Sequence, residues 1–280
     1  MDLSWLVISF AEIGWLVLTF FLGLAASKVG LPPLIGFLIV GFILKATGFE
    51  STHELRELAD LGVTLMLFTI GLKLDVKGLL KVQIWGVASA HMLITVIFFT
   101  VLIYAMSYSS IHFFADLNFW TTVLIAFALS FSSTVFAVKV LEGKSEMSAL
   151  YAQISIGILI MQDIFAVVFL TASTGKIPTP WALGLLLLPL FRPLLFKLMN
   201  SVKHGELLVL YGLLLATGGA ALFEMVGLKA DLGALILGIL LSKHNKASEL
   251  SKTLYSFKDL FLIAFFINIG LSGDPSLDHV

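Results

Sequence analysis

One ionisable residue, Asp163, stands in the middle of a strongly apolar stretch. Gln162 precedes it, and apolar residues predominate on both sides, from Ile154 to Thr171. An ionisable group at the centre of a bilayer is costly unless it meets water, a partner or an ion. A carboxylate that alternates between a proton and a cation meets that condition, and the Gln162 amide adds an uncharged carbonyl oxygen. Two structural roles compete: Asp163 could pair with a lysine of another segment, or stay protonated and donate a hydrogen bond.

A second polar patch, rich in hydroxyl groups, lies in the preceding apolar segment. Ser132, Ser133 and Thr134 follow one another, and Ser130 stands shortly before them. Hydroxyls in a membrane helix often bond back to the preceding helical turn, which is the structural explanation. Hydroxyl oxygens and freed backbone carbonyls are also hard ligands that suit Na⁺ or K⁺. A short turn joins the two segments, so we predict antiparallel neighbours whose polar patches both lie near mid-depth and form an alkali-cation site.

The remaining polar residues carry weaker signals. Asn268 lies inside a later apolar segment, where it could face the same cavity or bond to a neighbouring helix. His91 could titrate near neutral pH, although a packing role is more common. The sequence holds no cysteine, no nucleophile–base pair and no histidine pair at metal-ligand spacing. We therefore predict no enzymatic activity, no cofactor and no metal centre beyond the transported alkali cation.

Composition indicates which elements must position these groups. Of 280 residues, 59% are hydrophobic and 12% are charged, which is too little charge to cover a soluble surface. Apolar runs of about 20 residues match the thickness of a bilayer core. They predict an all-α polytopic membrane protein without a soluble regulatory domain, whose partner is the lipid bilayer. The net charge of −1 argues against a nucleic-acid partner. The ten predicted spans are residues 10–27, 32–47, 57–73, 83–106, 118–140, 148–173, 181–199, 206–226, 230–242 and 257–272.

The basic residues predict an orientation. With the N-terminus outside, Lys and Arg concentrate in inner loops, as the positive-inside rule requires. The outer loops then hold Lys45, Arg56, Lys176 and Lys229. The inner loops include Lys73, Lys77 and Lys81, and a charged loop predicted over Ser242–Lys258. No cleavable leader is evident at the N-terminus, so the first span is predicted to act as the insertion signal. We expect the protein to lie in a cell membrane, and a bacterial inner membrane is the simplest expectation.

Two segments are unusual for membrane spans. The seventh contains Pro189, Arg192 and Pro193, which predicts either a kink or an arginine that snorkels to the inner interface. The ninth, Ala230–Leu241, is short and contains glycines. Short spans occur at transporter binding sites, but a short span can also be one that is tilted or packed against its neighbours.

Five groups of residues, taken together, resemble a known family. They are, in chain order, Gly30–Gly36, Asp60–Asp75, Ser132–Thr134 with Lys139–Glu142, Gln162–Asp163, and Phe265–Ser272. In this order and spacing they resemble the monovalent cation:proton antiporter-2 family and, within it, the Kef-type potassium/proton antiporters. The resemblance extends over nearly the whole chain.

The resemblance implies a sodium/proton-antiporter-like inverted-repeat fold, in which a core domain moves against a dimerisation domain, and it suggests a homodimer. The core of such proteins has two crossing, partly unwound helices. Ser132–Thr134 would form one break, and Asp163 would be the ion carboxylate. The Gln162–Asp163 pair, in place of two adjacent acids, points to the Kef-like branch and to K⁺ rather than Na⁺. Because one carboxylate holds either one proton or one monovalent cation, we expect electroneutral exchange by competition at Asp163.

Residues 1–280 are predicted to form a single transport domain, with the first six spans in 1–175 and the seventh to tenth in 176–280. Family members usually have further spans, so we expect the second repeat to be incomplete. Two alternatives stay open. A ten-span sodium-coupled symporter of the bile-acid-symporter type would want a second polar cluster in the later half. A non-transporting membrane assembly subunit or fragment would be indifferent to Asp163→Asn.

Overall fold

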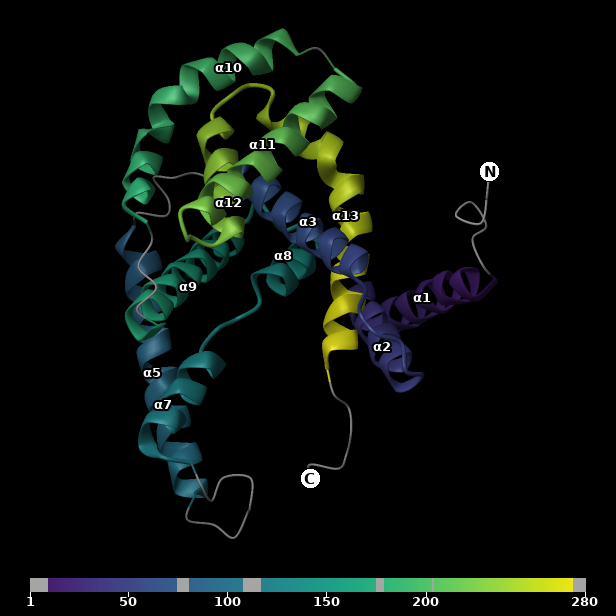
Figure 1. The fold of residues 1–280 in the computed structure, drawn as a ribbon, viewed down its shortest axis with the longest axis vertical. Helices are drawn as coiled ribbons and strands as arrows, with labels where there is room; N and C mark the ends of the chain where they lie inside the picture. Colours follow the sequence, from purple (N-terminus) through teal and green to yellow (C-terminus); the bar gives the residue numbers. More distant parts are fainter. Residues whose placement is uncertain (1–9, 75–80, 108–116, 175–178, 203, 274–280) are drawn as a thin grey trace. The chain divides into compact units, whose positions relative to one another are not determined.

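The computed structural model describes residues 10–74, 81–107, 117–174, 179–202 and 204–273, and the regular structure in these ranges is helical (Figure 1). The helices are α1 (Phe10–Lys28), α2 (Pro33–Ala46), α3 (His53–Gly71), α5 (Val82–Met106), α7 (Phe119–Leu129), α8 (Thr134–Gly143), α9 (Leu150–Thr174), the 3₁₀-helix η2 (Pro180–Phe191), α10 (Arg192–Ser201), α11 (Glu206–Met225), α12 (Ala230–Leu241) and α13 (Ala247–Ser272). Helix is therefore present in each of the ten apolar segments predicted from the sequence.

The helical, membrane-spanning class of the prediction is confirmed. Among the described residues, five helical stretches are long and apolar enough to cross a membrane, and they are Val82–Met106, Phe119–Gly143, Pro180–Ser201, Glu206–Met225 and Ala247–Ser272. Shorter apolar helices cover Gly14–Lys28, Pro33–Ala46, Leu150–Ala166 and Ala230–Leu241. The full count of ten spans and the inverted repeat stay predictions. Asp75, Lys77, Lys176 and residues 274–280 lie outside the described residues.

The predicted charged loop over Ser242–Lys258 is wrong for most of its length, because α13 begins at Ala247. Buried residues recur every four positions along this helix at Leu250, Leu254, Lys258 and Leu262, and the charged residues Lys252 and Asp259 lie at positions between them. Lys258 is fully buried, with Nζ 3.0 Å from Asp259 Oδ1 and 4.1 Å from the centre of the Tyr255 ring. The many charged residues of this segment suggested a loop, although its buried residues have the spacing of a helix.

The seventh segment is irregular, as its prolines predicted. Pro189 lies inside the 3₁₀-helix η2, and Pro193 lies in the first turn of α10, where a missing N–H costs nothing. The helix type changes between Phe191 and Arg192. The Arg192 guanidinium lies 4.7 Å from the centre of the Phe196 ring of the same helix α10, which is a cation–π contact.

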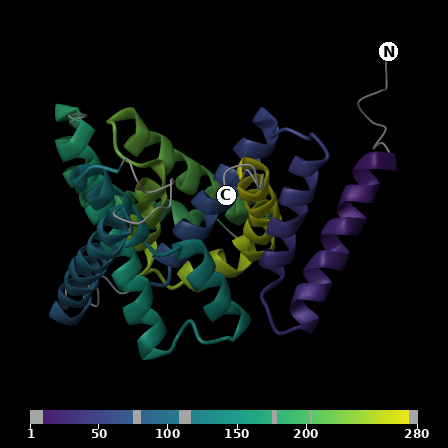
Figure 2. The same ribbon diagram turned by 90° about the horizontal axis from the view of Figure 1, so that it is seen from below.

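The helices form two compact units that are discontinuous in sequence. Unit 1 contains α1, α2, α3, α10, α11, α12 and α13, and unit 2 contains α5, α7, α8 and α9. The chain passes between the units after Lys73 and again between Ala182 and Leu183. In unit 1, α3 packs against both α12 and α13, and α2 packs against α1 and α13. Figure 2 shows the purple α1, the dark-blue α2 and the yellow α13 following one another in that order.

Glycines set the closest helix crossings of unit 1. A Cβ added at Gly71 of α3 would lie 2.3 Å from the Leu235 carbonyl oxygen of α12, and one at Gly41 of α2 would lie 2.2 Å from the Ile267 carbonyl oxygen of α13. Both approaches put backbone against backbone, which only residues without a side chain permit. Around the α3–α12 crossing, Leu65 and Phe68 are fully buried.

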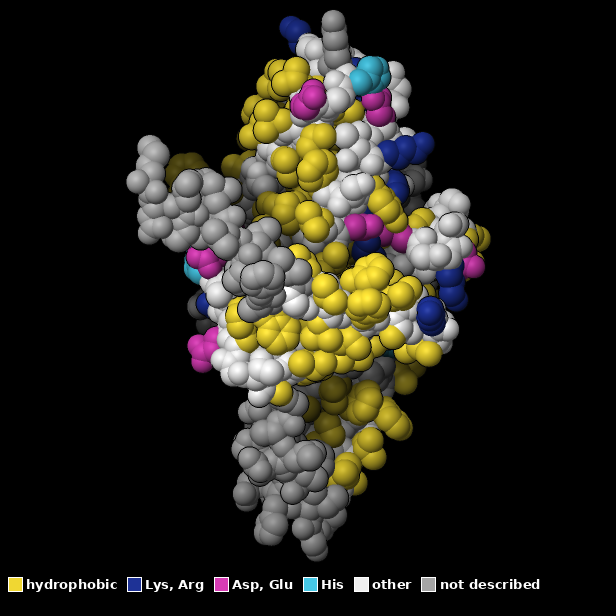
Figure 3. Space-filling view, turned by 90° about the vertical axis from the view of Figure 1, so that its right-hand side faces the viewer, with side chains coloured by type: hydrophobic (Ala, Val, Ile, Leu, Met, Phe, Trp, Pro, Cys, Tyr) yellow, Lys and Arg dark blue, Asp and Glu magenta, His cyan; other side chains and the backbone are white. Residues whose placement is uncertain are grey.

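Large apolar side chains also cover the outer surface. Trp181 is 82% exposed and Leu16 is 66% exposed, and hydrophobic side chains form broad patches on the face shown in Figure 3. Monomeric soluble proteins rarely expose apolar patches of this extent. Such a surface fits contact with lipid.

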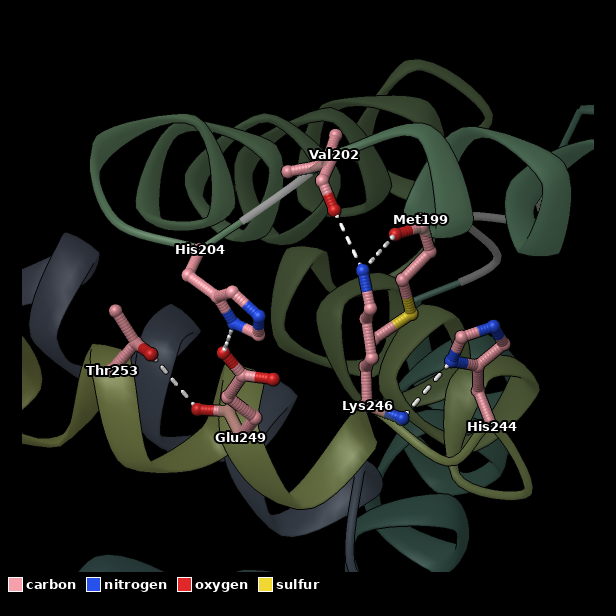
Figure 4. A network of polar contacts seen from close by, with 7 residues as sticks. All are labelled: Met199, Val202, His204, His244, Lys246, Glu249 and Thr253. Atoms are coloured by element: carbon pink, nitrogen blue, oxygen red, sulfur yellow. Dashed lines mark hydrogen bonds and ion pairs between the residues drawn. The ribbon is translucent and has the colours of Figure 1, made fainter.

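A polar network ties the α12–α13 loop to the end of α10 (Figure 4). Lys246 Nζ donates to the carbonyl oxygens of Met199, at 3.4 Å, and Val202, at 2.8 Å. These are orphan carbonyls at a helix C-terminus, where a cation is favoured. His244 Nδ1 accepts a 3.1 Å bond from the Lys246 N–H. The His204 ring contacts the Glu249 carboxylate at the start of α13.

This network predicts loss of stability in acid. Burial lowers the pKa of His244, and the nearby Lys246 charge lowers it further. The folded protein therefore favours neutral His244, and stability present above the unfolded pKa of about 6.5 is lost as the pH falls below it. We expect the melting temperature in detergent to fall between pH ~8 and ~5.5, and to fall less in His244→Asn, whose amide oxygen accepts the same bond. In the control His204→Gln, which loses a partner of Glu249, the fall should be no smaller than in wild type. An equal fall in wild type and His244→Asn contradicts this.

Candidate ion-binding site

A break in the helix lies where the sequence places its hydroxyl cluster. α7 ends at Leu129, α8 begins at Thr134, and residues 130–133 between them are not helical. Ser133 caps α8, because its Oγ accepts a 3.2 Å bond from the Phe136 N–H. The fifth predicted span is thus two half-helices. The carbonyl end of α7 and the N–H end of α8 both lie at the break, and the resemblance implied a break at this place.

Gln162 of α9 bridges this break. Its Nε2 donates to the Ser130 carbonyl oxygen at 3.3 Å, and its Oε1 accepts from the Ser132 N–H at 3.3 Å. Gln162 is only 2% exposed, so both bonds lie inside unit 2. They satisfy one backbone acceptor and one backbone donor that the interrupted helix no longer pairs. Gln162, expected from the sequence to offer oxygen to an ion, is a backbone partner in this structure.

Asp163 is the next residue of α9, and its carboxylate reaches the start of α8. Thr134 Oγ1 donates to Asp163 Oδ2 over 3.4 Å, which is a long hydrogen bond. Thr134 is buried and Asp163 is partly buried. The carboxylate therefore lies beside the N-terminal turn of a helix, where the peptide dipoles favour negative charge.

The other hydroxyls of the cluster have different roles. Ser130 is buried, and its Oγ donates to the Phe127 carbonyl oxygen at 2.7 Å, which is a bond back to the preceding helical turn, the structural explanation for such hydroxyls. Ser132 and Ser133 are exposed. Their oxygens lie on the accessible side of the break, close in sequence to the Thr134–Asp163 contact.

Asn268 belongs to a different part of the structure. It lies in α13 of unit 1, and its Oδ1 accepts a hydrogen bond from the Ser51 hydroxyl just before α3. Of the two roles that the sequence left open, the structure shows a bond between segments. The other six predicted site residues, Ser130, Ser132, Ser133, Thr134, Gln162 and Asp163, all belong to unit 2.

The break in unit 2 has the parts that an alkali-cation site needs. The carbonyl end of α7 presents partial negative charge, as half-helix C-termini do in other ion sites. Asp163 adds a full negative charge, and hydroxyl oxygens add neutral hard ligands. Among the described residues, no cluster of three or more His, Cys, Asp or Glu side chains could hold a metal ion.

The bridge predicts a stability effect at Gln162. In Gln162→Leu the buried Ser130 carbonyl and the partly buried Ser132 N–H lose their side-chain partner, and an unsatisfied buried group costs about 1–3 kcal/mol. We expect a melting temperature several degrees lower than that of wild type, measured in detergent by intrinsic fluorescence.

A matched control exists on the same helix. Gln153 of α9 is exposed, and its side-chain Nε2 donates to the Ser148 carbonyl oxygen. Gln153→Leu makes the same chemical change without opening the break, so it should leave the melting temperature nearly unchanged. If the two variants lose equal stability, Gln162 does not hold the break together.

Comparison with known proteins adds to this geometry. A family profile described as "Sodium/hydrogen exchanger, transmembrane" matches residues 16–279. The chain is 28% identical to the K(+) efflux antiporter 1, chloroplastic, of Arabidopsis thaliana, over 94% of this chain and 24% of that protein. It is 27% identical to the K(+) efflux antiporter 2, chloroplastic, of the same plant, over 96% of this chain and 25% of that protein. It is also 27% identical to the putative cation/proton antiporter YbaL of Escherichia coli (strain K12), over 94% of this chain and 51% of that protein. The chain thus spans between a quarter and a half of the length of these relatives.

Proposed function

Since this chain belongs to the transmembrane sodium/hydrogen exchanger family, we propose that it exchanges a monovalent cation for H⁺ across a membrane, with the Asp163 carboxylate as the shared binding group. The observation that carries the proposal is the position of Asp163 beside Thr134, at the first turn of α8 and next to the break that Gln162 bridges. Membership of an antiporter family supports transport over the symporter and assembly-subunit alternatives.

One carboxylate gives the exchange its stoichiometry. Asp163 holds either a proton or a cation, because binding of the cation requires the ionised form. The unwound residues 130–133 supply further oxygens to the cation, and Thr134 donates a hydrogen bond to the carboxylate. Each transport cycle then moves one positive charge in each direction, which makes the exchange electroneutral.

We propose K⁺ as the physiological cation. Two relatives bear the name K(+) efflux antiporter, and residue 162 is the amide Gln162 rather than a second acid beside Asp163. Because the site holds neutral oxygens and a single charge, the electrostatic field that it exerts on a cation is weak. A weak field favours K⁺ over Na⁺, because K⁺ is larger and more easily dehydrated. Na⁺ is the competing substrate.

The proposed setting rests on the resemblance for the homodimer and on the positive-inside rule for the orientation. The protein is a homodimer in a cell membrane, with its N-terminus outside and Lys73 and Lys81 on the inner side. A bacterial inner membrane fits this orientation, and the E. coli relative belongs to a bacterium.

Cation-induced loss of a preset pH gradient in proteoliposomes tests the proposal. We expect added K⁺ to dissipate the gradient faster than Na⁺, and choline to have no effect beyond that seen in protein-free liposomes. Clamping the membrane potential at different values should leave the rate unchanged if the exchange is electroneutral. The antiport proposal fails if folded protein responds to neither ion, and the assignment of K⁺ fails if Na⁺ is the more effective.

A further inference from the structure

An apolar groove lies in unit 1, whereas the residues of the proposed ion site belong to unit 2. It has a volume of about 650 Å³ and is lined by α1, α2, α3 and α13, with Leu16, Phe20 and Leu24 on α1, Phe37 on α2, Leu58 on α3 and Ala264 on α13. This volume is in the range of pockets that hold small molecules, about 300–1,000 Å³.

The lining of the groove is almost entirely apolar. Its two hydroxyl side chains bond within α1, because Thr19 Oγ1 donates to the Trp15 carbonyl oxygen at 2.7 Å and Ser27 Oγ donates to the Gly23 carbonyl oxygen at 3.1 Å. The other lining residues are Leu, Phe, Ile, Ala, Gly and Pro. Such a lining favours an apolar occupant such as a hydrocarbon chain.

The length of the groove fits one lipid chain. Its α1 lining extends from Leu16 to Ser27, which corresponds to about 16 Å along a helix that rises 1.5 Å per residue. One leaflet contributes roughly half of the ~30 Å hydrocarbon core of a bilayer. The groove thus matches the reach of a single acyl chain within one leaflet, and it is too short to span both.

A positive charge stands at one end of the groove. Lys28 is exposed, lies in the last turn of α1 and directly follows the groove residue Ser27. A phospholipid whose chain fills the groove would have its phosphate at this level, within reach of a flexible lysine side chain. Basic side chains at the membrane interface attract anionic headgroups.

We propose that this groove binds one acyl chain of an anionic phospholipid, with the headgroup phosphate at Lys28. The proposal depends only on the protein lying in a membrane and not on its transport activity. The lipid fills the space between α1 and α13, two helices whose shared neighbour is α2, and so holds α1 in unit 1.

Lipid retention by the purified protein tests this proposal. Native mass spectrometry in detergent, with added phosphatidylglycerol or phosphatidylcholine, reports the lipids bound. We expect one tightly bound phosphatidylglycerol on wild type and weaker binding of phosphatidylcholine. Ala264→Trp, which fills the groove, and Ser27→Phe, at its exposed rim, should each weaken the binding of both lipids about tenfold or more. Lys28→Gln should remove the preference for phosphatidylglycerol.

The control is Ile269→Trp, an exposed position of the same helix α13 outside the groove, which should bind lipid as wild type does. Asp163→Asn should also bind as wild type, which separates this proposal from the proposed function. The proposal is overturned if Ala264→Trp and Ser27→Phe, both folded, retain lipid as wild type does. It is also overturned if Ala264→Trp converts a dimer to monomers while the bound lipid is retained. The groove would then be the contact surface between two copies of this chain.

Discussion

Replacing Asp163 by Asn is expected to reduce cation-driven proton movement in proteoliposomes to the level of protein-free liposomes. The amide has almost the same shape as the carboxyl group and can still accept the hydrogen bond from Thr134, so the break between α7 and α8 should persist. It cannot ionise, however, so it neither releases a proton nor neutralises a bound cation. In the proposed mechanism the proton and the cation share this one carboxylate, so its loss should stop coupled exchange.

The measurement pairs transport with folding. Rates of dissipation of the pH gradient are compared for wild type, Asp163→Asn and Glu57→Gln, with melting temperatures in detergent for all three. Glu57 is an exposed carboxylate of α3 that pairs with His53 on the surface, so its neutralisation should leave transport unchanged. A folded Asp163→Asn protein that transports at a rate near that of wild type would remove Asp163 from the mechanism.

Replacing Gly238 by Leu is expected to cause a large loss of stability, greater than that of Gln162→Leu. A Cβ at Gly238 would lie 2.2 Å from the Phe68 carbonyl oxygen and 3.0 Å from the Gly71 Cα. Neither atom can move without its helix, so α3 and α12 must separate and pull apart the core that contains Leu65. Overpacking of this kind costs about 3 kcal/mol or more, and we expect the melting temperature to fall by roughly 10 °C.

Gly218 of α11 supplies the matched control. A Cβ there would meet nothing within 4 Å, so Gly218→Leu makes the same change in open space within a helix. Leucine has the better helix propensity, and this variant should therefore be as stable as wild type or slightly more stable. Equal losses in the two variants would show that helix composition, rather than the α3–α12 contact, sets the stability.

Local sequence determined the helices and indicated the candidate site residues of unit 2. Apolar runs, with prolines and glycines between them, predicted ten segments that all contain helix, because helix formation depends on residues within a few positions of one another. Local sequence also indicated Asp163 and the hydroxyls of residues 130–134 as candidate site residues. These polar groups lie inside apolar runs, and that contrast is visible in the sequence itself. The prediction was wrong at the start of α13, where the many charged residues indicated a loop. The four-residue spacing of Leu250 and Leu254 there is that of a helix.

Tertiary structure alone decided which partners these residues have. Gln162 bonds to Ser130 and Ser132, thirty or more positions away, and Asn268 bonds to Ser51 across most of the chain. No local pattern encodes such pairs, because they form only when packing brings distant helices together. Packing likewise made the first three helices part of the same unit as the last four, since a helix joins the neighbours that bury its apolar and glycine faces rather than those next to it in sequence.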